Sequence, residues 1–388
     1  MAKTLSNNPL SPKSKKLLKS ISYRTLLSPF IVQRTRAVTQ QYNPTKVPDR
    51  PVPEFIAIFV YDYNQTQIKQ EKLPDIKTCF AFVDSPHVTW INIDGIRKED
   101  VEELCNRYKI HMLIQEDILS VGQRPKMDEI DGIMYCLMNM LYFNEASGGV
   151  EQEQISIVIG KNFVISIQED AKRDVFNPLR EKLQFANSKL RQSKADYLFY
   201  TMIDLIVDNF FVVMEKLGER IEVIEEEIIR KANKETLNKV NQLRKEMIVL
   251  KRNLNPVRDL VSGILRSDSE RLEEKTKKYF KDIYDHIVQA SDLAENYRDM
   301  VMGLQDLYLN NVNLKMNEIM KFLAIVTTLM APATVIGGVF GMNFDAIPYA
   351  HHRLGFWLAV GIMIFLPLLM VYFFWKRGWF GKDVPSED

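Results

Sequence analysis

Three consecutive residues, Gly341, Met342 and Asn343, lie at the end of a long apolar run, and their types suit contact with a hydrated cation. Mg²⁺ loses its bound water reluctantly, so a site that binds and releases it should offer neutral acceptors to that water rather than a cage of carboxylates. The Asn343 carboxamide is such an acceptor, and Gly341 can end a helix so that backbone carbonyls become available. The same residues would also serve as a plain helix stop, so the tripeptide alone leaves both interpretations open.

A second set of candidate residues follows one face of the helix upstream of this tripeptide. Steps of three and four residues bring neutral polar, apolar or small side chains to one side, and this face is free of charge from Asn310 onward. Its residues are Gly303, Asp306, Asn310, Asn313, Asn317, Met320, Leu323, Thr327, Ala331, Thr334 and Gly338. The alternatives are a solvated face below a small-residue packing seam, or the lining of a water-filled pore. Because the polar and apolar parts are continuous, the pattern favours the pore.

Two uncharged runs, residues 322–344 and 355–375, must position these side chains. Each reaches the roughly 20 residues that a helix needs to cross a bilayer core, so we predict two transmembrane helices joined by an external loop at 345–354. The outer ends of this hairpin are flanked by Lys315, Lys321, Lys376, Arg377 and Lys382. Such flanking charge predicts that both termini are cytosolic.

Two spans cannot enclose a channel, so a pore would need a ring of identical chains, each of which contributes one helix. Met320 and Leu323, at the inner membrane edge, would then form stacked apolar rings that close by dewetting. The sequence thus predicts a ring-shaped homo-oligomer.

A long stalk helix is predicted over residues 267–321, because no proline interrupts the chain before Pro332. Ser267 and Glu270 have the spacing of a capping box at its start. A break near Gly303 is the alternative. Upstream, residues 171–266 predict a helical hairpin that turns near 232–234, followed by a short helix with Pro256 in its first turn.

An α/β domain is predicted over residues 51–170. Runs rich in β-branched and aromatic residues indicate strands at "EFIAIFVYD", "TCFAFVD" and "HVTWINIDG", and an antiparallel meander at "GIMYCLMNMLYF", "EQISIVIG" and "NFVISIQED". Helical spacing occurs in "RKEDVEELCNRYKI" and "QEDILS". The fold class is therefore an α/β cytosolic domain and a long α-helical stalk that continues into a two-helix transmembrane hairpin.

The absence of several sequence motifs argues against some classes of function. The 388 residues contain no phosphate-binding loop, no dinucleotide fingerprint, no zinc-protease motif and no cysteine-histidine metal box, which argues against an enzyme, an organic cofactor, a bound nucleotide or a nucleic-acid partner. Residues 1–50 carry ten Lys and Arg against one acid and predict a basic, disordered tail, with weak attachment to anionic lipid as the alternative. A short cytosolic tail follows at 376–388.

The sequence resembles the CorA family of divalent-cation transporters from about residue 50 onward. "YLNNVNLKMNEIMKFLAIVTTLMAPATVIGGVFGMNF" is similar to the end of the family's stalk, its first span and its G-M-N signature in one register. "QEDILSVGQRPKMD" and "YFKDIYDH" resemble stretches of the family's cytosolic domain. The resemblance implies a homopentamer in the inner membrane that admits Mg²⁺ passively, with Co²⁺ or Ni²⁺ as substitutes.

The resemblance also implies roles for particular residues. Gly341, Met342 and Asn343 match the outer selectivity site; Asn317, Met320 and Leu323 match the pore and its hydrophobic gate; and Asp306 matches an inner pore acid. Glu116, Asp117 and Asp282 match acids that bind regulatory Mg²⁺ between subunits, where loss of the ion lets like charges repel and the ring open.

Two departures from the family pattern concern the pore. Pro348 precedes Tyr349, where many relatives carry an acid, and Ala331 lies where a bulkier residue is common. The adjacent His351 and His352 raise the alternative of a zinc transporter of the same architecture, with or without proton coupling. The alternative from another class is a non-conducting, membrane-anchored scaffold.

Overall fold

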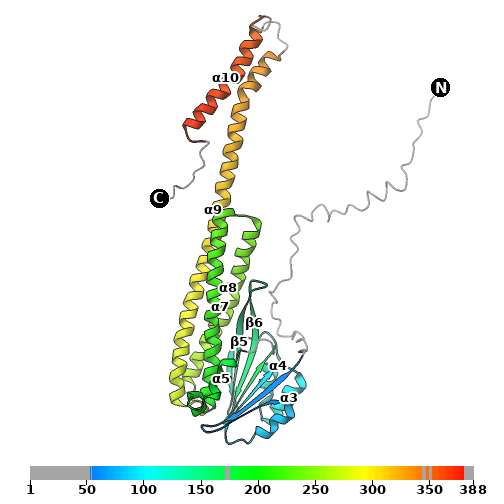
Figure 1. Ribbon diagram of the computed structural model, residues 1–388, viewed down its shortest axis with the longest axis vertical. Helices are drawn as coiled ribbons and strands as arrows, with labels where there is room; N and C mark the ends of the chain where they lie inside the picture. Colours follow the sequence, from blue (N-terminus) through cyan, green and yellow to red (C-terminus); the bar gives the residue numbers. More distant parts are fainter. Residues whose placement is uncertain (1–52, 54, 171–174, 343–346, 349–351, 380–388) are drawn as a thin grey trace, which may run out of the picture. The chain divides into compact units, whose positions relative to one another are not determined.

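The structure is a computed structural model that describes residues 53, 55–170, 175–342, 347–348 and 352–379. Its strands are β1 (Ala57–Tyr63), β2 (Ile68–Leu73), β3 (Val88–Asp94), β4 (Lys126–Ile130), β5 (Ile133–Asn144), β6 (Gly149–Ile159) and β7 (Phe163–Gln168). Its helices are η1 (Ile76–Phe82), α3 (Lys98–Arg107), α4 (Met112–Leu119), α5 (Asn177–Gln184), α6 (Lys189–Gln192), α7 (Ala195–Lys231), α8 (Lys234–Arg266), α9 (Glu274–Phe340) and α10 (Gly355–Lys376). These elements belong to one compact unit, residues 52–119 and 123–388 (Figure 1).

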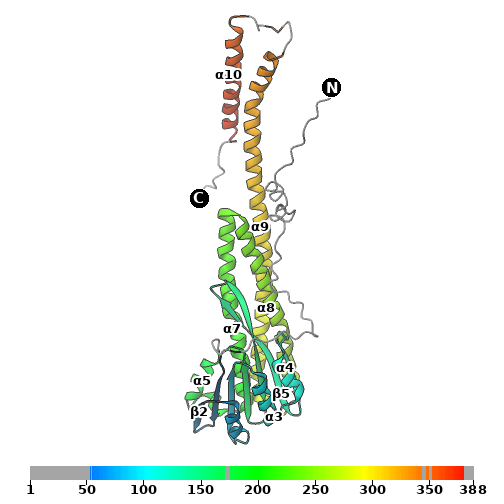
Figure 2. The ribbon, with the colours of Figure 1, turned by 90° about the vertical axis from the view of Figure 1, so that its right-hand side faces the viewer.

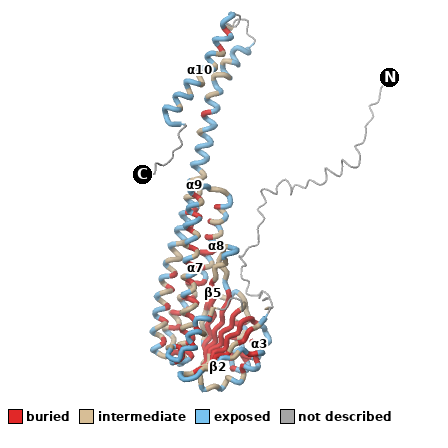
Figure 3. Tube along the Cα trace, viewed as in Figure 1, coloured by how far each residue is buried: buried red, intermediate tan, exposed pale blue. Residues whose placement is uncertain are grey.

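The strands form a single seven-stranded sheet in the order β2-β1-β3-β7-β6-β5-β4. Strands β3 and β7 pair in parallel, and every other neighbouring pair is antiparallel, including the predicted meander β5-β6-β7. The central strands are buried on both faces, which explains their nearly continuous apolar runs (Figure 3).

Each face of the sheet has its own core. One face packs against η1, α3 and α4 through residues such as Cys79, Leu104 and Ile118. The other packs against α5, α7 and α8, and α9 extends the same core by packing against α7 and α8. Alternate residues along a strand therefore contribute to opposite cores. The free cysteines Cys79, Cys105 and Cys136 are buried, and burial raises the pKa of the Cys79 and Cys105 thiols to about 12, so these thiols are unreactive.

The predicted strand at "TCFAFVD" was wrong: Ile76–Phe82 forms the 3-10 helix η1. The Asp75 carboxylate accepts hydrogen bonds from the Thr78 backbone N–H at 2.9 Å and the Thr78 hydroxyl at 2.8 Å, which caps a helix start. Ile76 and Cys79, three residues apart, both point into the core. A capped turn thus overrides the strand propensity of the aromatic residues.

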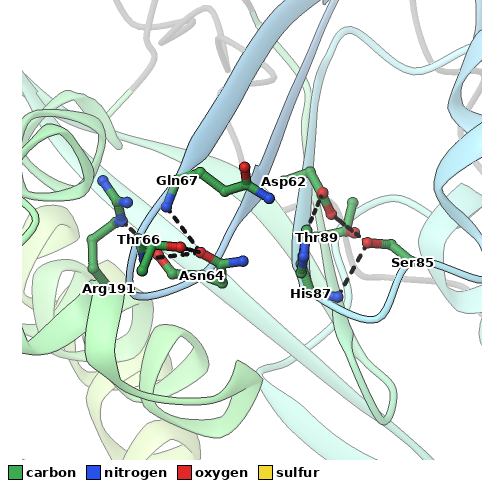
Figure 4. A network of polar contacts seen from close by, with 8 residues as sticks. All are labelled: Asp62, Asn64, Thr66, Gln67, Ser85, His87, Thr89 and Arg191. Atoms are coloured by element: carbon green, nitrogen blue, oxygen red, sulfur yellow. Dashed lines mark hydrogen bonds and ion pairs between the residues drawn. The ribbon is translucent and has the colours of Figure 1, made fainter.

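A polar network links the end of β1 to the start of β3 (Figure 4). Asp62 on β1 accepts hydrogen bonds from Ser85 Oγ at 2.7 Å and Thr89 Oγ1 at 2.7 Å, and pairs with His87 Nδ1 at 2.9 Å. Burial raises the pKa of the Asp62 carboxyl, but these three partners together lower it further than burial raises it. The net pKa lies below the ordinary value, so the charged carboxylate stabilises the fold.

Acidification should therefore weaken this part of the fold. Because the pKa of Asp62 is lower in the folded than in the unfolded state, its contribution is complete above pH ~4 and is lost as pH falls through the folded value. We expect Asp62→Asn to cost about 1–2 kcal/mol of stability near neutral pH and to flatten the acid limb of a denaturation curve. Thermal unfolding of the two proteins between pH 3 and 7 measures this, and parallel acid limbs would contradict it.

The helical hairpin turns where the pattern predicted: α7 ends at Lys231, and Asn233 caps α8 by accepting from the Thr236 N–H at 2.8 Å. The short helix predicted at Pro256 was wrong, because α8 continues through this proline to Arg266. Asn253, Leu254 and Val257 are buried around it. Packing on both sides of the proline thus holds the helix together despite the missing N–H.

Helix α9 runs unbroken for 67 residues, about 100 Å at 1.5 Å per residue, through Gly303 and Pro332 (Figure 2). It begins at Glu274, not at Ser267 as predicted, and ends at Phe340, four residues before the predicted end of the first span. The Ser267 side chain accepts from the Ser269 N–H at 3.2 Å and does not cap α9. Residues 267–273 instead connect α8 to α9.

The first half of α9 packs against α7 and α8 through Phe280, Ile283 and Ile287 among others. This packing ends near Asn311, whose Nδ2 donates to the Ile228 carbonyl of α7 at 2.7 Å. Beyond that point α9 contacts α10 (Figure 1). Many of its apolar side chains there are exposed.

Three helices in the described residues are long and apolar enough to cross a membrane: α7, α9 and α10. The most apolar window of α7 is 56% buried inside the fold, whereas those of α9 and α10 are each 6% buried. Helix α7 is therefore a core helix, while the apolar surfaces of α9 and α10 are free to meet a bilayer. The second predicted span, 355–375, matches α10 to within one residue.

Candidate functional site

The chain's own elements leave the predicted pore face uncovered. Asp306, Asn310, Asn313 and every later member of the face up to Gly338 are exposed on α9. Helix packing explains this exposure: Leu304, which is buried against the hairpin, and Asp306 are two residues apart and thus point about 200° apart around the helix. This account applies to the part of α9 that packs on the hairpin; from Asn313 to Phe340 most residues on every side of α9 are exposed, the candidate residues among them.

The side chains on this face change in character along α9, from asparagines to apolar residues to threonines. Met320 and Leu323 are 54% and 62% exposed apolar groups, and three asparagines precede them. Further along, Thr327 Oγ1 donates to the Leu323 carbonyl at 2.8 Å and Thr334 Oγ1 donates to the Met330 carbonyl at 3.0 Å. Each threonine hydrogen is thereby used within the helix, so the hydroxyl oxygen remains as an acceptor.

The end of α9 fits part of the tripeptide prediction. Gly341 follows the last helical residue, and its N–H donates to the Gly337 carbonyl at 2.9 Å. A side-chain Cβ at this position would lie 3.0 Å from the same carbonyl, a tight contact that glycine avoids. Met342 is exposed, while Asn343 and His351 lie outside the described residues. His352 is exposed, and its Nδ1 accepts from the Leu354 N–H at 3.3 Å in a local turn.

The predicted regulatory acids lie in opposite layers. Glu116 and Asp117 are on α4, which covers one face of the sheet, and Asp282 is on α9, which packs against the helices α7 and α8 that cover the other. Asp117 is held within the chain by Lys126 Nζ, 2.6 Å from its Oδ2, and by Gln123 Nε2, 3.0 Å from its Oδ1. One chain therefore does not bring the acids of the two layers together.

A further cluster of possible metal ligands lies next to Asp282. Asp204 and Asp208 on α7 and His286 on α9 place one ligand atom each within 4.8 Å of the others. The His286 Nδ1 is buried and has no hydrogen-bond partner among the described residues. Burial, followed by the charge of Asp208, raises the pKa of the Asp204 carboxyl, and Asp282 adds to the repulsion. A bound cation would give the His286 Nδ1 a partner and would also offset the repulsion among the aspartates.

Sequence reasoning missed this cluster. Asp204 and Asp208 have the i, i+4 spacing that places two carboxylates on one helix face, and His286 is four residues from Asp282. Those spacings could have indicated it. Nothing local, however, indicates that the two faces meet, because the helices are about 80 positions apart in the chain.

Together, the two uncovered apolar helices and the uncharged face of α9 indicate an integral membrane protein, and the cluster of Asp204, Asp208 and His286 could hold a cation. Comparison with known proteins identifies its family. The family described as "CorA-like Mg2+ transporter protein" matches residues 85–377. The cobalt/magnesium transport protein CorA of Thermotoga maritima is 36% identical over 327 residues, which cover 84% of this chain and 93% of the relative. The chain belongs to the CorA-like Mg²⁺ transporter family, whose members are transporters and not enzymes.

More distant relatives agree. The cobalt/magnesium transport protein CorA of Methanocaldococcus jannaschii is 24% identical over 291 residues, which cover 75% of this chain and 90% of that protein. The complete structure of the CorA magnesium transporter from the same organism matches with a TM-score of 0.68 at 23% identity, and covers 83% of this chain and 98% of that one. The predicted fold class, an α/β domain with a long helical stalk and a C-terminal hairpin, is thereby confirmed.

Proposed function

We propose that this protein is a passive, channel-like transporter that admits Mg²⁺, and Co²⁺ or Ni²⁺ as substitutes, across the cytoplasmic membrane as a homopentamer with both termini in the cytosol. The observation that carries the proposal is the uncovered face of α9 from Asp306 to Gly338, which is uncharged from Asn310 onward. Such a long uncharged face, exposed in one chain, would line a water-filled pore if several copies surrounded a common axis.

Selection of the ion is proposed to occur at Gly341, Met342 and Asn343. Neutral acceptors there would contact the first water shell of Mg²⁺, which the ion keeps because dehydration is costly. Past this point, the asparagines and threonines would offer further neutral oxygens, with Asp306 as a single acid at the inner end. The gate would be the apolar level formed by Met320 and Leu323.

Closure by cytosolic Mg²⁺ is proposed to act between subunits. Because Asp117 and Asp282 lie in opposite layers of one chain, a cation that bridges them would bind across two copies. The cluster of Asp204, Asp208 and His286, beside Asp282, would supply a second cation site at the same border. Its mixed nitrogen and oxygen donors favour Co²⁺, Ni²⁺ or Zn²⁺ over Mg²⁺.

Divalent flux into liposomes that contain the purified protein tests the transport proposal. We expect Mg²⁺ to enter down its gradient without a pH gradient, and more Mg²⁺ on the protein's cytosolic side to slow it. If Zn²⁺ moved instead and responded to an imposed pH gradient, the protein would be a zinc transporter of this architecture. If neither ion moved, the scaffold alternative would replace both.

The cluster makes a separate prediction about stability. The raised pKa of Asp204 means that its charged form opposes folding above that pKa, and that the penalty disappears as pH falls through it. At neutral pH without divalent cations, we expect Asp204→Asn to raise the melting temperature by a few degrees, about 1 kcal/mol. We also expect it to reduce the further rise that Co²⁺ produces.

Asp285, an exposed acid on α9, provides the matched control: Asp285→Asn should leave the response to Co²⁺ unchanged. Differential scanning fluorimetry of the three proteins in EDTA and in Co²⁺ measures both effects. A full response to Co²⁺ in Asp204→Asn would show that the cluster holds no ion.

A further inference from the structure

We propose that Lys126 is a built-in competitor for the regulatory cation at Asp117, and that it sets the Mg²⁺ concentration at which this site fills. The inference rests on the proposed regulatory role of Asp117. Lys126 Nζ lies 2.6 Å from Asp117 Oδ2, and Gln123 Nε2 lies 3.0 Å from Oδ1. Both carboxylate oxygens therefore already have a donor from the same chain.

The backbone around Asp117 is fixed, while its charged partner is free to move. Ile114 and Ile118, on the same short helix, are fully buried, and Gln154 Nε2 approaches the Asp117 carbonyl at 3.4 Å. The Lys126 side chain, by contrast, is 36% exposed and ends in a flexible four-carbon chain. The carboxylate is thus a fixed ligand, and the ammonium group is the part that can leave.

An alternative partner for the displaced ammonium lies close by. Asp128 Oδ2 is 3.5 Å from the same Nζ, and its side chain is 46% exposed. When a divalent cation approaches Asp117, Lys126 can rotate toward Asp128 and keep an ion pair. The exchange replaces one positive charge at Asp117 by two without leaving an unpaired ammonium.

Competition of this kind has two consequences. The site is not a bare carboxylate when the regulatory ion is absent, which limits the repulsion between subunits. The apparent affinity for Mg²⁺ is also lower than that of the same ligands without the lysine, because binding must first break a partly buried ion pair. Lys126 thus raises the Mg²⁺ concentration needed for closure.

The ordinary alternative is a salt bridge that only holds β4 against α4. Such a bridge would make Lys126→Met less stable at every Mg²⁺ concentration. The competitor role predicts a loss that is confined to low Mg²⁺ and recovered when Mg²⁺ fills the site. The two roles therefore differ in how stability depends on Mg²⁺.

The test is a Mg²⁺ titration of thermal stability, with the full-length protein in lipid nanodiscs. We expect Lys126→Met to lower the half-saturating Mg²⁺ concentration on the order of fivefold, which corresponds to about 1 kcal/mol of ion-pair energy. Lys126→Gln, which keeps a hydrogen-bond donor without the charge, should give the same shift if the methionine variant does not assemble. Lys126→Arg, which keeps the charge, should not lower the concentration.

Lys161, exposed in the turn between β6 and β7, supplies a matched control, and Lys161→Met should leave the titration unchanged. Asp117→Asn distinguishes a failure of the regulatory role of Asp117 from a failure of the competitor role of Lys126. If Asp117→Asn responds to Mg²⁺ like the unaltered protein, the regulatory role of Asp117 is wrong. If Asp117→Asn loses the response while Lys126→Met and Lys126→Gln titrate at the unaltered midpoint, only the competitor role of Lys126 is overturned.

Discussion

Replacing Asn343 by alanine is expected to reduce Mg²⁺ entry at least about tenfold while the protein still assembles. Alanine removes the carboxamide acceptor at the end of the proposed pore and adds no bulk. Without this acceptor, the entrance provides less compensation for ordering the hydration shell of the ion. Influx into liposomes under a fixed Mg²⁺ gradient measures the effect, normalised to the amount of assembled protein.

The control for this variant lies in the predicted external loop that follows Asn343 in the sequence. Ile347→Ala removes a side chain of similar reach that carries no acceptor, so it should leave influx unchanged. Equal influx through Asn343→Ala and the unaltered protein would remove Asn343 from the selection site. If neither protein admitted Mg²⁺, the result would instead favour a non-conducting role.

Leu323→Asn is expected to abolish closure at high cytosolic Mg²⁺. Leu323 is 62% exposed on the face of α9 that would line the axis, so a ring of leucines would form a narrow apolar level there. Water leaves such a level readily, which stops ions without a physical plug. A ring of carboxamides would stay hydrated, so influx should persist at the Mg²⁺ concentration that closes the unaltered protein.

The adjacent residue provides a matched control. Phe322 is 68% exposed, and it projects about 100° away from Leu323 around the helix. Phe322→Asn makes the same polar change off the proposed pore face and should close normally. The measured quantity is the ratio of influx at low and at closing Mg²⁺, which we expect to fall to about one in Leu323→Asn alone. Normal closure in that variant would place the gate elsewhere.

The local pattern of apolar and polar residues determined where the helices lie. Hydropathy and spacing are local properties. They predicted the hairpin turn near residues 232–234 and the second apolar helix to within one residue, and they predicted an unbroken stalk helix, although it begins at Glu274 rather than at Ser267. They also predicted that one face of α9 is uncharged, which the structure leaves exposed. Where a local preference competed with burial, the prediction failed, as at the strand expected in η1 and the helix start expected at Pro256.

The tertiary structure decided which of these faces meet. It brought His286 on α9 beside Asp204 and Asp208 on α7, and it paired Lys126 on β4 with Asp117 on α4. The sequence encodes the residue types and which side of each element is apolar, because these depend on neighbours three or four positions away. It does not reveal the partner of a polar face, because that partner is selected by packing between elements that are remote in the chain.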